Sequence, residues 1–262
     1  MVRHEHNVIA QKGKFISAGL SGIVELLSSG LISKSPHPGA LLGPDSRIEI
    51  ANEAKIYAHL GPEPGLIRME SYTEGVLLLQ YMPNGNLKDY LRAHSNTISM
   101  SQRLQWACEA ADRVRLLHSR DVIHCDIKPE NFLLDAELCL RIVDFASSSL
   151  KGSRVLECRT TRFSLPRGPR EQPTARSDIF SLGSTIYMIM TGKGPFEELD
   201  SDEVARSYKS EVFPSCTGTS CDEFIQWCWR GKFTSAQEAY DHITALVILY
   251  SHDPLISELL SD

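Results

Sequence analysis

The stretch "VIHCDIKPENFLLD", residues 122–135, decides how the chain is interpreted. Asp126 precedes Lys128 by two residues and Asn131 by five, and Pro129 keeps this part of the chain out of a regular helix. A carboxylate can accept a hydroxyl proton, an ammonium can neutralise a transferring phosphate, and an amide oxygen suits Mg²⁺. The spacing therefore indicates a loop suited to phosphoryl transfer.

A second acidic residue follows at a defined distance. Asp144 stands thirteen residues beyond Asn131, in "LCLRIVDF", at the end of an apolar run. Mg²⁺ is held in proteins by a few carboxylate or amide oxygens together with phosphate oxygens and water. Asn131 and Asp144 are therefore the predicted metal ligands, with Asp126 as the predicted base.

Composition limits the class of protein. The chain has 262 residues, 42% of them hydrophobic, which suits one large domain or two modest lobes. Its seven cysteines include no C-x-x-C pair, so we expect free thiols in a reducing compartment. A net charge of −6 argues against a nucleic-acid partner.

We expect an intracellular protein, cytoplasmic or nuclear. The N-terminal stretch "MVRHEHNVIAQKGK" is polar and lacks the apolar core of a signal peptide. The most apolar run, "ITALVILY", is far shorter than the roughly 18 residues that span a membrane. We therefore expect no membrane partner.

The first third of the sequence predicts a small antiparallel sheet with one helix. "KFISAGLSGIVELLSSGLISK", residues 14–34, alternates apolar and polar residues in three short runs, and "VLLLQYM", residues 76–82, predicts a further strand. Between them, residues 46–60 form a predicted helix that opens with a capping box from Ser46 to Glu49 and ends at Gly61.

The remainder predicts a helical lobe. Capping boxes begin at Ser99, Ser220 and Ser235. One helical stripe is apolar, and its members are Leu104, Ala107, Ala111, Val114 and Leu117. A sheet followed by a helical lobe leaves a cleft between them, where ligands tend to bind.

Two further features of the first third fit a phosphate site. Gly19 and Gly22, in "SAGLSGIV", would let a hairpin backbone approach phosphates closely. Lys34 ends an apolar strand, and Glu53 on the following helix could face it. Taken singly, each feature fits an ordinary turn or a solvated side chain better. The two features support a phosphate site only in combination with the motif at residues 122–135.

Taken together, these motifs and their order resemble the eukaryotic protein kinase family over nearly the whole chain. "SAGLSGIV" resembles its Gly-rich loop with Ser17 in place of the first Gly, and "LISK" the strand with the nucleotide-binding Lys, whose partner would be Glu53. "LLLQYMPNGNLKDYL" resembles the hinge, which implies that Leu79 guards the back of the pocket. The implied nucleotide-binding residues are Ser17, Gly19, Gly22, Val24, Lys34, Glu53, Leu79, Gln80, Tyr81 and Met82.

The resemblance implies a single α+β domain of the bilobal kinase fold, with an N-lobe at residues 1–82 and a C-lobe at 83–262. It implies ATP and Mg²⁺ as cofactors and a protein Ser or Thr hydroxyl as acceptor, because Lys128 is the Ser/Thr-kinase residue at its position. Thr160 would contact this Lys. Asp178, in "SDIFSLG", would brace the catalytic loop from below.

Three residues depart from the family pattern. Cys125 replaces the Arg that usually holds a phosphorylated activation loop. Ala146 replaces the Gly after Asp144-Phe145, and Arg167 stands where the family has a Glu that pairs with a basic residue.

Because Lys34, Asp126 and Asp144 remain, an active Ser/Thr kinase is the leading hypothesis. The alternative is a pseudokinase that binds a nucleotide or a partner; a small-molecule phosphotransferase fits less well. The sequence does not indicate the substrate or the oligomeric state.

Overall fold

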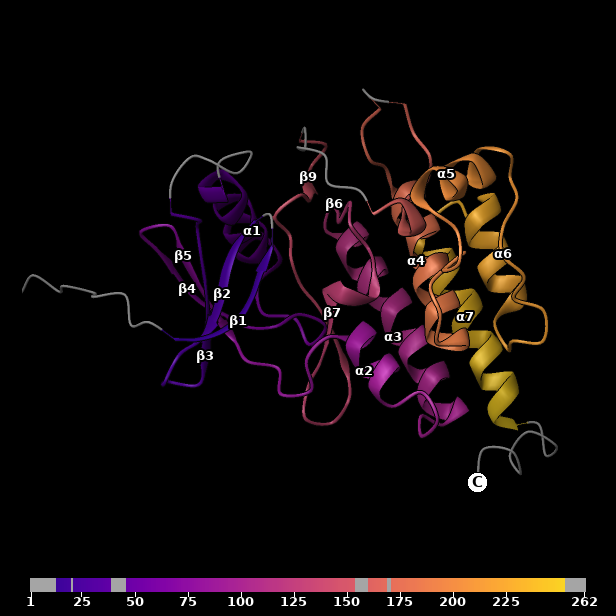
Figure 1. The fold of residues 1–262 in the computed structure, drawn as a ribbon, viewed down its shortest axis with the longest axis horizontal. Coiled ribbons are helices and arrows are strands. Elements are labelled where there is room, and N and C mark those ends of the chain that lie inside the picture. The colour runs from indigo at the N-terminus through magenta and orange to yellow at the C-terminus, as the bar shows by residue number, and fades with distance from the viewer. Residues whose placement is uncertain (1–12, 20, 39–45, 154–159, 169–170, 253–262) are drawn as a thin grey trace, which may run out of the picture.

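The computed structural model describes residues 13–19, 21–38, 46–153, 160–168 and 171–252. Figure 1 shows two parts side by side, a sheet with one helix at the N-terminal side and a larger helical part that follows it. The chain therefore has the bilobal architecture of an antiparallel N-terminal sheet and a mostly helical C-terminal part, as the sequence predicted.

The N-terminal sheet has five antiparallel strands in the order β1-β2-β3-β5-β4. They are β1 (Lys14–Gly19), β2 (Gly22–Leu26), β3 (Leu31–Ser35), β5 (Val76–Gln80) and β4 (Met69–Thr73). The three strands expected at 14–34 and the one at 76–82 are confirmed. The sequence analysis missed β4, whose side chains are mainly polar and mainly exposed.

Helix α1 (Ser46–Leu60) packs against β3, β4 and β5. It ends as predicted: Gly61 has φ +70°, and its N–H donates to the Tyr57 carbonyl over 2.9 Å. It also begins at Ser46 as predicted, and the Ser46 hydroxyl accepts a hydrogen bond from the backbone N–H of His37 at 3.1 Å. Ser46 thus connects the helix to the chain that follows β3.

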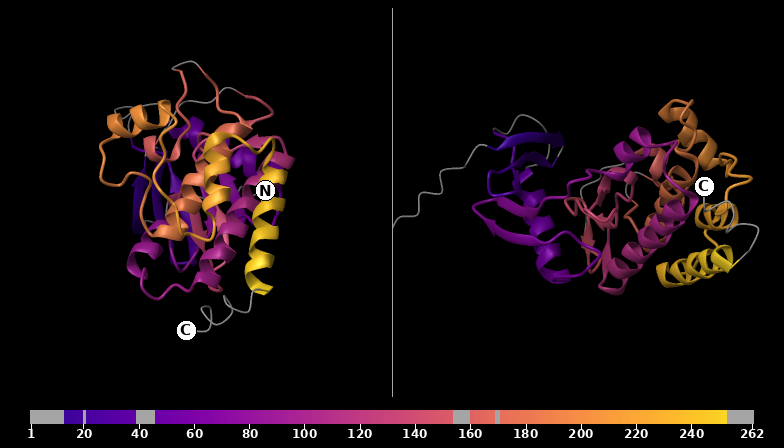
Figure 2. Two further views of the ribbon diagram at one scale, coloured as in Figure 1. Left: turned by 90° about the vertical axis from the view of Figure 1, so that its right-hand side faces the viewer. Right: turned by 90° about the horizontal axis from the view of Figure 1, so that it is seen from below.

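The C-terminal part is built around three long helices. Its helices are α2 (Leu87–Ala93), α3 (Met100–Ser119), α4 (Ala175–Thr191), α5 (Ser201–Lys209), α6 (Asp222–Arg230) and α7 (Ala236–His252). Helix α3 packs against α4 and α7, and α4 packs against α6 (Figure 2). The predicted stripe of α3 is buried throughout, at 0–3% exposure.

The predicted helix starts are partly right. The Ser99 and Ser235 hydroxyls accept from the N–H groups of Gln102 and Glu238 at 3.1 Å. The start predicted at Ser220 is wrong, because α6 begins at Asp222 with Cys221 as its N-cap residue.

Short strands fix the loop between α3 and α4. β6 (Val122–Ile123) pairs with β9 (Ser149–Leu150), and β7 (Phe132–Leu134) pairs with β8 (Leu140–Ile142). The residues "HCDIKPEN", which we call the 124–131 loop, lie between β6 and β7 and end in the short 3₁₀ turn Pro129–Asn131. Both ends of this loop are thereby tied into small sheets.

Among the described residues, no helix is long and apolar enough to cross a membrane. The described cysteines, at positions 108, 125, 139, 216, 221 and 228, are free thiols, and Cys158 lies outside the described residues.

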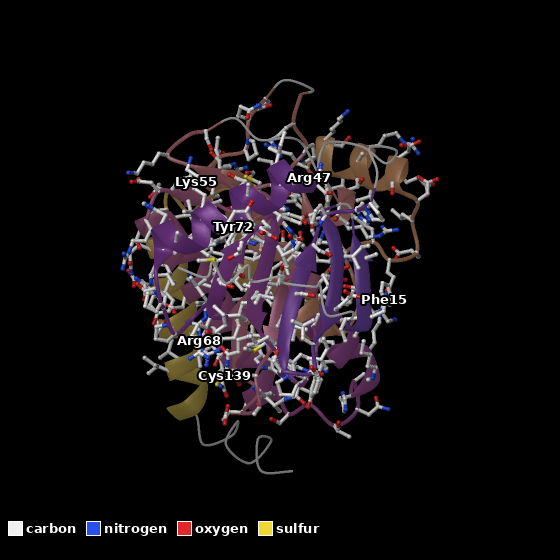
Figure 3. All side chains as sticks on the ribbon, turned by 90° about the vertical axis from the view of Figure 1, so that its left-hand side faces the viewer. Phe15, Arg47, Lys55, Arg68, Tyr72 and Cys139 are labelled. Atoms are coloured by element: carbon white, nitrogen blue, oxygen red, sulfur yellow. The ribbon has the colours of Figure 1, made fainter. Side chains whose placement is uncertain are left out.

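Phe15 on β1 and Tyr72 on β4 are exposed on the outer side of the sheet part (Figure 3).

Helices α4 and α6 approach closely at Gly183, where an added Cβ would lie 2.5 Å from the Cβ of Cys228. We expect Gly183→Ala to lower the free energy of unfolding by about 1–3 kcal/mol, because the two helices must separate to admit the methyl group. In Gly194→Ala, the new Cβ would meet the Cδ of Arg162 at 3.9 Å, an ordinary contact, and the change should be below about 0.5 kcal/mol. Urea denaturation followed by circular dichroism measures both, and equal effects would contradict the packing argument.

Candidate active site

A cavity of about 510 Å³ lies between the sheet and the helical part, within the usual size of small-molecule sites. The predicted nucleotide and metal residues that line it are Ser17, Gly19, Gly22, Val24, Lys34, Glu53, Leu79, Gln80, Tyr81, Met82, Asn131 and Asp144. Asp126 and Lys128 do not line the cavity themselves. Asp126 is joined to it through Asn131.

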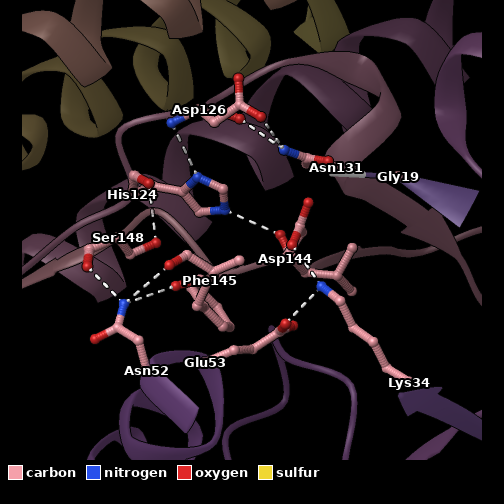
Figure 4. Close-up of polar contacts among 12 residues, drawn as sticks. Gly19, Lys34, Asn52, Glu53, His124, Asp126, Asn131, Asp144, Phe145 and Ser148 are labelled. Atoms are coloured by element: carbon pink, nitrogen blue, oxygen red, sulfur yellow. Dashed lines mark hydrogen bonds and ion pairs between the residues drawn. The ribbon is translucent and has the colours of Figure 1, made fainter. Parts of the chain in front are cut away.

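Lys34 is the centre of the site. Its Nζ lies 2.6 Å from a Glu53 carboxylate oxygen and 2.7 Å from the Asp144 carboxylate (Figure 4). The side chains of Lys34 and Glu53 are only 8% and 1% exposed, whereas that of Asp144 is 36% exposed and lines the cavity. One buried ammonium thus connects β3, α1 and the chain after β8.

The electrostatics of this triad follow from its burial. Burial would lower the pKa of Lys34, but the Asp144 and Glu53 carboxylates raise it above its usual value, so the ammonium stays charged. Burial would raise the pKa of Asp144, yet the Lys34 ammonium holds it below its usual value. For Glu53, burial outweighs Lys34 and raises the pKa. The lowered pKa of Asp144 keeps its carboxylate ionised where it faces the cavity.

The polar side chains of the 124–131 loop contact one another. The Asn131 Nδ2 donates to the Asp126 carbonyl at 2.8 Å and to its carboxylate at 3.1 Å. Lys128 lies with its Nζ 2.5 Å from the Asp126 carboxylate and 3.4 Å from the Thr160 hydroxyl. The contact predicted between Lys128 and Thr160 is thereby confirmed.

Asp178 of α4 holds this loop from below, as predicted. Its carboxylate accepts the backbone N–H of His124 at 2.7 Å and that of Cys125 at 2.9 Å. His118 of α3 lies 3.0 Å from the same carboxylate. Cys125 has a left-handed φ of +72°, which is costly outside glycine, and the hydrogen bond to Asp178 helps to hold it there.

Phe145 forms the apolar connection between α1 and the loop. It is fully buried, with Tyr57 of α1 edge-on at 4.9 Å between ring centroids and His124 at 5.3 Å. His124 also bonds the Val143 carbonyl through Nε2 at 3.0 Å. The residues that flank Asp144 are therefore fixed against both α1 and the 124–131 loop.

The two predicted hairpin glycines have different environments. A Cβ at Gly19 would meet nothing within 4 Å, which leaves room for a close ligand. At Gly22, φ is +147° and a Cβ would lie 2.5 Å from the Ser35 carbonyl oxygen, so glycine is required there by the packing of β2 on β3.

The cavity also contains residues that sequence reasoning missed. Ile16, Ile32, Leu133 and Val143 supply apolar side chains to its lining. Leu133 could have been found from its place two residues after Asn131. The others lie on ordinary apolar strands or beside them and gave no separate signal.

The donor set fits a Mg²⁺ ion with a bound nucleotide. The Asn131 amide nitrogen is engaged by Asp126, which leaves its oxygen for a cation, and Asp144 is ionised and open to the cavity. In the part of the chain that the structure describes, no group of three His, Cys, Asp or Glu side chains could hold a metal by itself. One carboxylate and one amide instead suit an ion that takes its other ligands from phosphates and water.

Comparisons with known proteins agree with this architecture. The sequence model of the protein kinase domain family matches residues 43–242 of this chain. The chain is 27% identical over 195 residues to the serine/threonine/tyrosine-protein kinase HT1 of Arabidopsis thaliana, covering 70% of this chain and 48% of that protein. It is 31% identical over 161 residues to the RGS domain-containing serine/threonine-protein kinase A of Dictyostelium discoideum, covering 59% and 14%.

The family match extends over more than half of the sequence, so the chain belongs to the protein kinase domain family. It spans between about a tenth and about half of the length of the curated relatives that it matches.

Removal of the central cation leaves two carboxylates that both faced it. We expect Lys34→Met to lower the free energy of unfolding by about 3 kcal/mol at pH 8, towards the low end for a broken buried pair because Asp144 is partly exposed. The facing carboxylates raise each other's pKa, so the folded variant binds a proton as pH falls, and the loss relative to the native chain should be smaller at pH 5.5.

Chemical denaturation of the native chain and the variant at both pH values tests this. The double variant Lys34→Met, Glu53→Gln is the control, because it removes one of the two like charges and should show a weaker pH dependence. An equal loss for Lys34→Met at pH 5.5 and 8 would exclude carboxylate repulsion as the cause.

Proposed function

We propose that this chain is a Ser/Thr protein kinase that transfers the γ-phosphate of ATP to a protein hydroxyl. The observation that carries the proposal is the Lys34 ammonium bound to both Glu53 and Asp144, on the same cavity as Asn131. In protein kinases the corresponding Lys–Glu pair and metal Asp must both be in place for transfer. Membership of the kinase family supports the reaction class.

Each polar residue then has a role that its contacts support. Asp126 accepts the proton of the acceptor hydroxyl, and Asn131, through its hydrogen bonds to Asp126, keeps that carboxylate beside the cavity. Asn131 and Asp144 would hold Mg²⁺, which would supply charge neutralisation on the phosphate oxygens. Lys34 orients the phosphates from the sheet side, and Lys128 balances charge on the acceptor side. The Gly19 backbone has the open space that a phosphate chain needs.

The expected acceptor is a Ser or Thr hydroxyl in a protein. Lys128 is the residue that Ser/Thr kinases carry at this position, and its contact with Thr160 ties the acceptor side of the loop to the chain before the 3₁₀ turn Thr161–Phe163. The names of both relatives include serine/threonine-protein kinase, and that of HT1 also includes tyrosine, so they support a protein hydroxyl as the acceptor.

A radiolabelled ATP assay with Mg²⁺ on a generic basic protein tests the proposal. We expect Asp126→Asn and Asp144→Asn each to lower the rate at least about 10²-fold, the first by loss of the base and the second by loss of a metal ligand. Asp202→Asn, on the exposed side of α5, is the matched control and should keep the native rate. If the native chain binds ATP but transfers no phosphate, the chain is a nucleotide-binding pseudokinase.

We also propose that activity does not require phosphorylation of the chain after Asp144. Cys125 lies where kinases usually have an Arg that binds the phosphate, and burial, together with the nearby Asp178, raises the pKa of its thiol. The thiol is therefore neutral and lies 3.2 Å from the Ile123 carbonyl. A neutral thiol forms no charge-assisted bond with a phosphate.

Phosphatase treatment of active protein should accordingly leave the rate within about twofold of its starting value. The assay is the same phosphoryl transfer, with mass spectrometry to establish that residues 147–164 are unmodified. Loss of activity on treatment, restored by phosphorylation within that range, would contradict the proposal.

A further inference from the structure

Asn52 of α1 makes an unusual set of contacts. Its Nδ2 lies 3.3 Å from the Phe145 carbonyl oxygen, 3.1 Å from that of Ala146 and 3.0 Å from that of Ser148 (Figure 4). Only a donor can serve three carbonyls, which fixes the orientation of the amide, and its two hydrogens must be shared among them. All three acceptors belong to residues 144–148, "DFASS", which we call the 144–148 segment.

The 144–148 segment needs such a partner because it has little regular structure. It lies between β8 and β9, and Asp144 at its start has a left-handed φ of +66°. Phe145 and Ser148 are fully buried, so their carbonyls cannot rely on water. Asn52 supplies hydrogen bonds that no neighbouring strand provides to the 146 and 148 carbonyls in the described contacts.

The far side of the segment is tied to the 124–131 loop. The Ser148 hydroxyl donates to the His124 carbonyl at 2.9 Å, and the His124 N–H donates to Asp178. A continuous line of hydrogen bonds therefore runs from Asn52 on α1 through Ser148 and His124 to Asp178 on α4. Rotation or outward movement of α1 would break this line and the adjacent Glu53–Lys34 pair together.

We propose that Asn52 is a positioning residue that holds the 144–148 segment against α1, and so keeps Asp144 beside Lys34 without a phosphate-binding Arg at position 125. This inference rests on the proposed function for its consequence in catalysis. Asn52 and Glu53 are consecutive on the helix: Glu53 binds the ammonium from the sheet, and Asn52 binds the backbone that carries the metal ligand. The two residues couple the position of α1 to the position of Asp144.

Asn52 touches neither nucleotide residues nor Asp144 itself, so its effect must pass through the backbone. Release of the segment should make its amides exchange faster with solvent. It should also weaken the contribution of Mg²⁺ to nucleotide binding, because Asp144 is no longer held in place, while binding without Mg²⁺, which depends on the hairpin and residues 80–82, changes little.

The test compares Asn52→Ala and Asn52→Asp with Lys55→Ala, an exposed position on the same helix (Figure 3). Asn52→Asp keeps the volume but presents an acceptor to three carbonyls. Hydrogen exchange by mass spectrometry over residues 144–150, and titration with a fluorescent ATP analogue with and without Mg²⁺, are the measurements. For both Asn52 variants we expect exchange at least tenfold faster, a Mg²⁺ enhancement of affinity at least fivefold smaller, and Mg²⁺-free affinity within threefold of the native chain.

In the transfer assay, kcat of the Asn52 variants should fall at least tenfold with KM for the acceptor protein within threefold. If the native chain transfers no phosphate, the proposed function fails, but exchange and Mg²⁺ dependence still decide the role of Asn52. The inference would be overturned if the Asn52 variants matched Lys55→Ala both in the amide exchange of residues 144–150 and in the Mg²⁺ dependence of nucleotide affinity. If neither Asn52 variant folds, Asn52 serves the fold and not the position of Asp144, and the inference is rejected.

Discussion

The buried Lys34 ammonium is the interaction on which the rest of the arrangement depends. An unpaired charge in this position would cost several kcal/mol, so the fold must bring carboxylates to it from elsewhere. Glu53 arrives on α1 and Asp144 arrives from the far side of the cleft, each within 2.7 Å of the nitrogen. The buried Lys34 ammonium therefore fixes the relative positions of the sheet, helix α1 and the helical part, because no one of them supplies all of its partners.

Much of the fold could be predicted because its elements carry local signals. The alternation at 14–34 and the glycine after Leu60 depend on neighbouring residues, and the structure contains the strands and the helix end that they predicted. Strand β4 was missed because its polar residues, in "MESYT", owe their conformation to pairing with β5. The start at Ser220 was wrong because Cys221, fully buried among the C-terminal helices, takes the N-cap position without a side-chain cap.

The residues of the candidate site likewise fall into those with a local sequence signal and those that depend on tertiary contacts. Asp126, Lys128 and Asn131 lie within one short loop, so their spacing was visible in the sequence. Asn52 was not found, because a polar side chain on a helix usually faces solvent, and only the tertiary fold brings three carbonyls from ninety or more residues away to its amide. The role of Glu53 could be suggested from the helical stripe, but the triad with Asp144 required the fold.

Cys125 illustrates how a loop can keep its shape after losing a side chain that the family usually has. The left-handed backbone at this position is held by the N–H bond to Asp178, and the adjacent His124 N–H shares the same carboxylate. The geometry is thus set by the backbone of residue 125 and by a buried acid on α4, and it does not depend on a guanidinium. On the other side of the loop, the His124 carbonyl accepts a hydrogen bond from the Ser148 hydroxyl. The Ser148 carbonyl in turn accepts from the Asn52 amide on α1. A neutral residue can therefore occupy position 125 while Asp126 keeps its position in the loop, because the contacts that fix the loop come from α1 and α4.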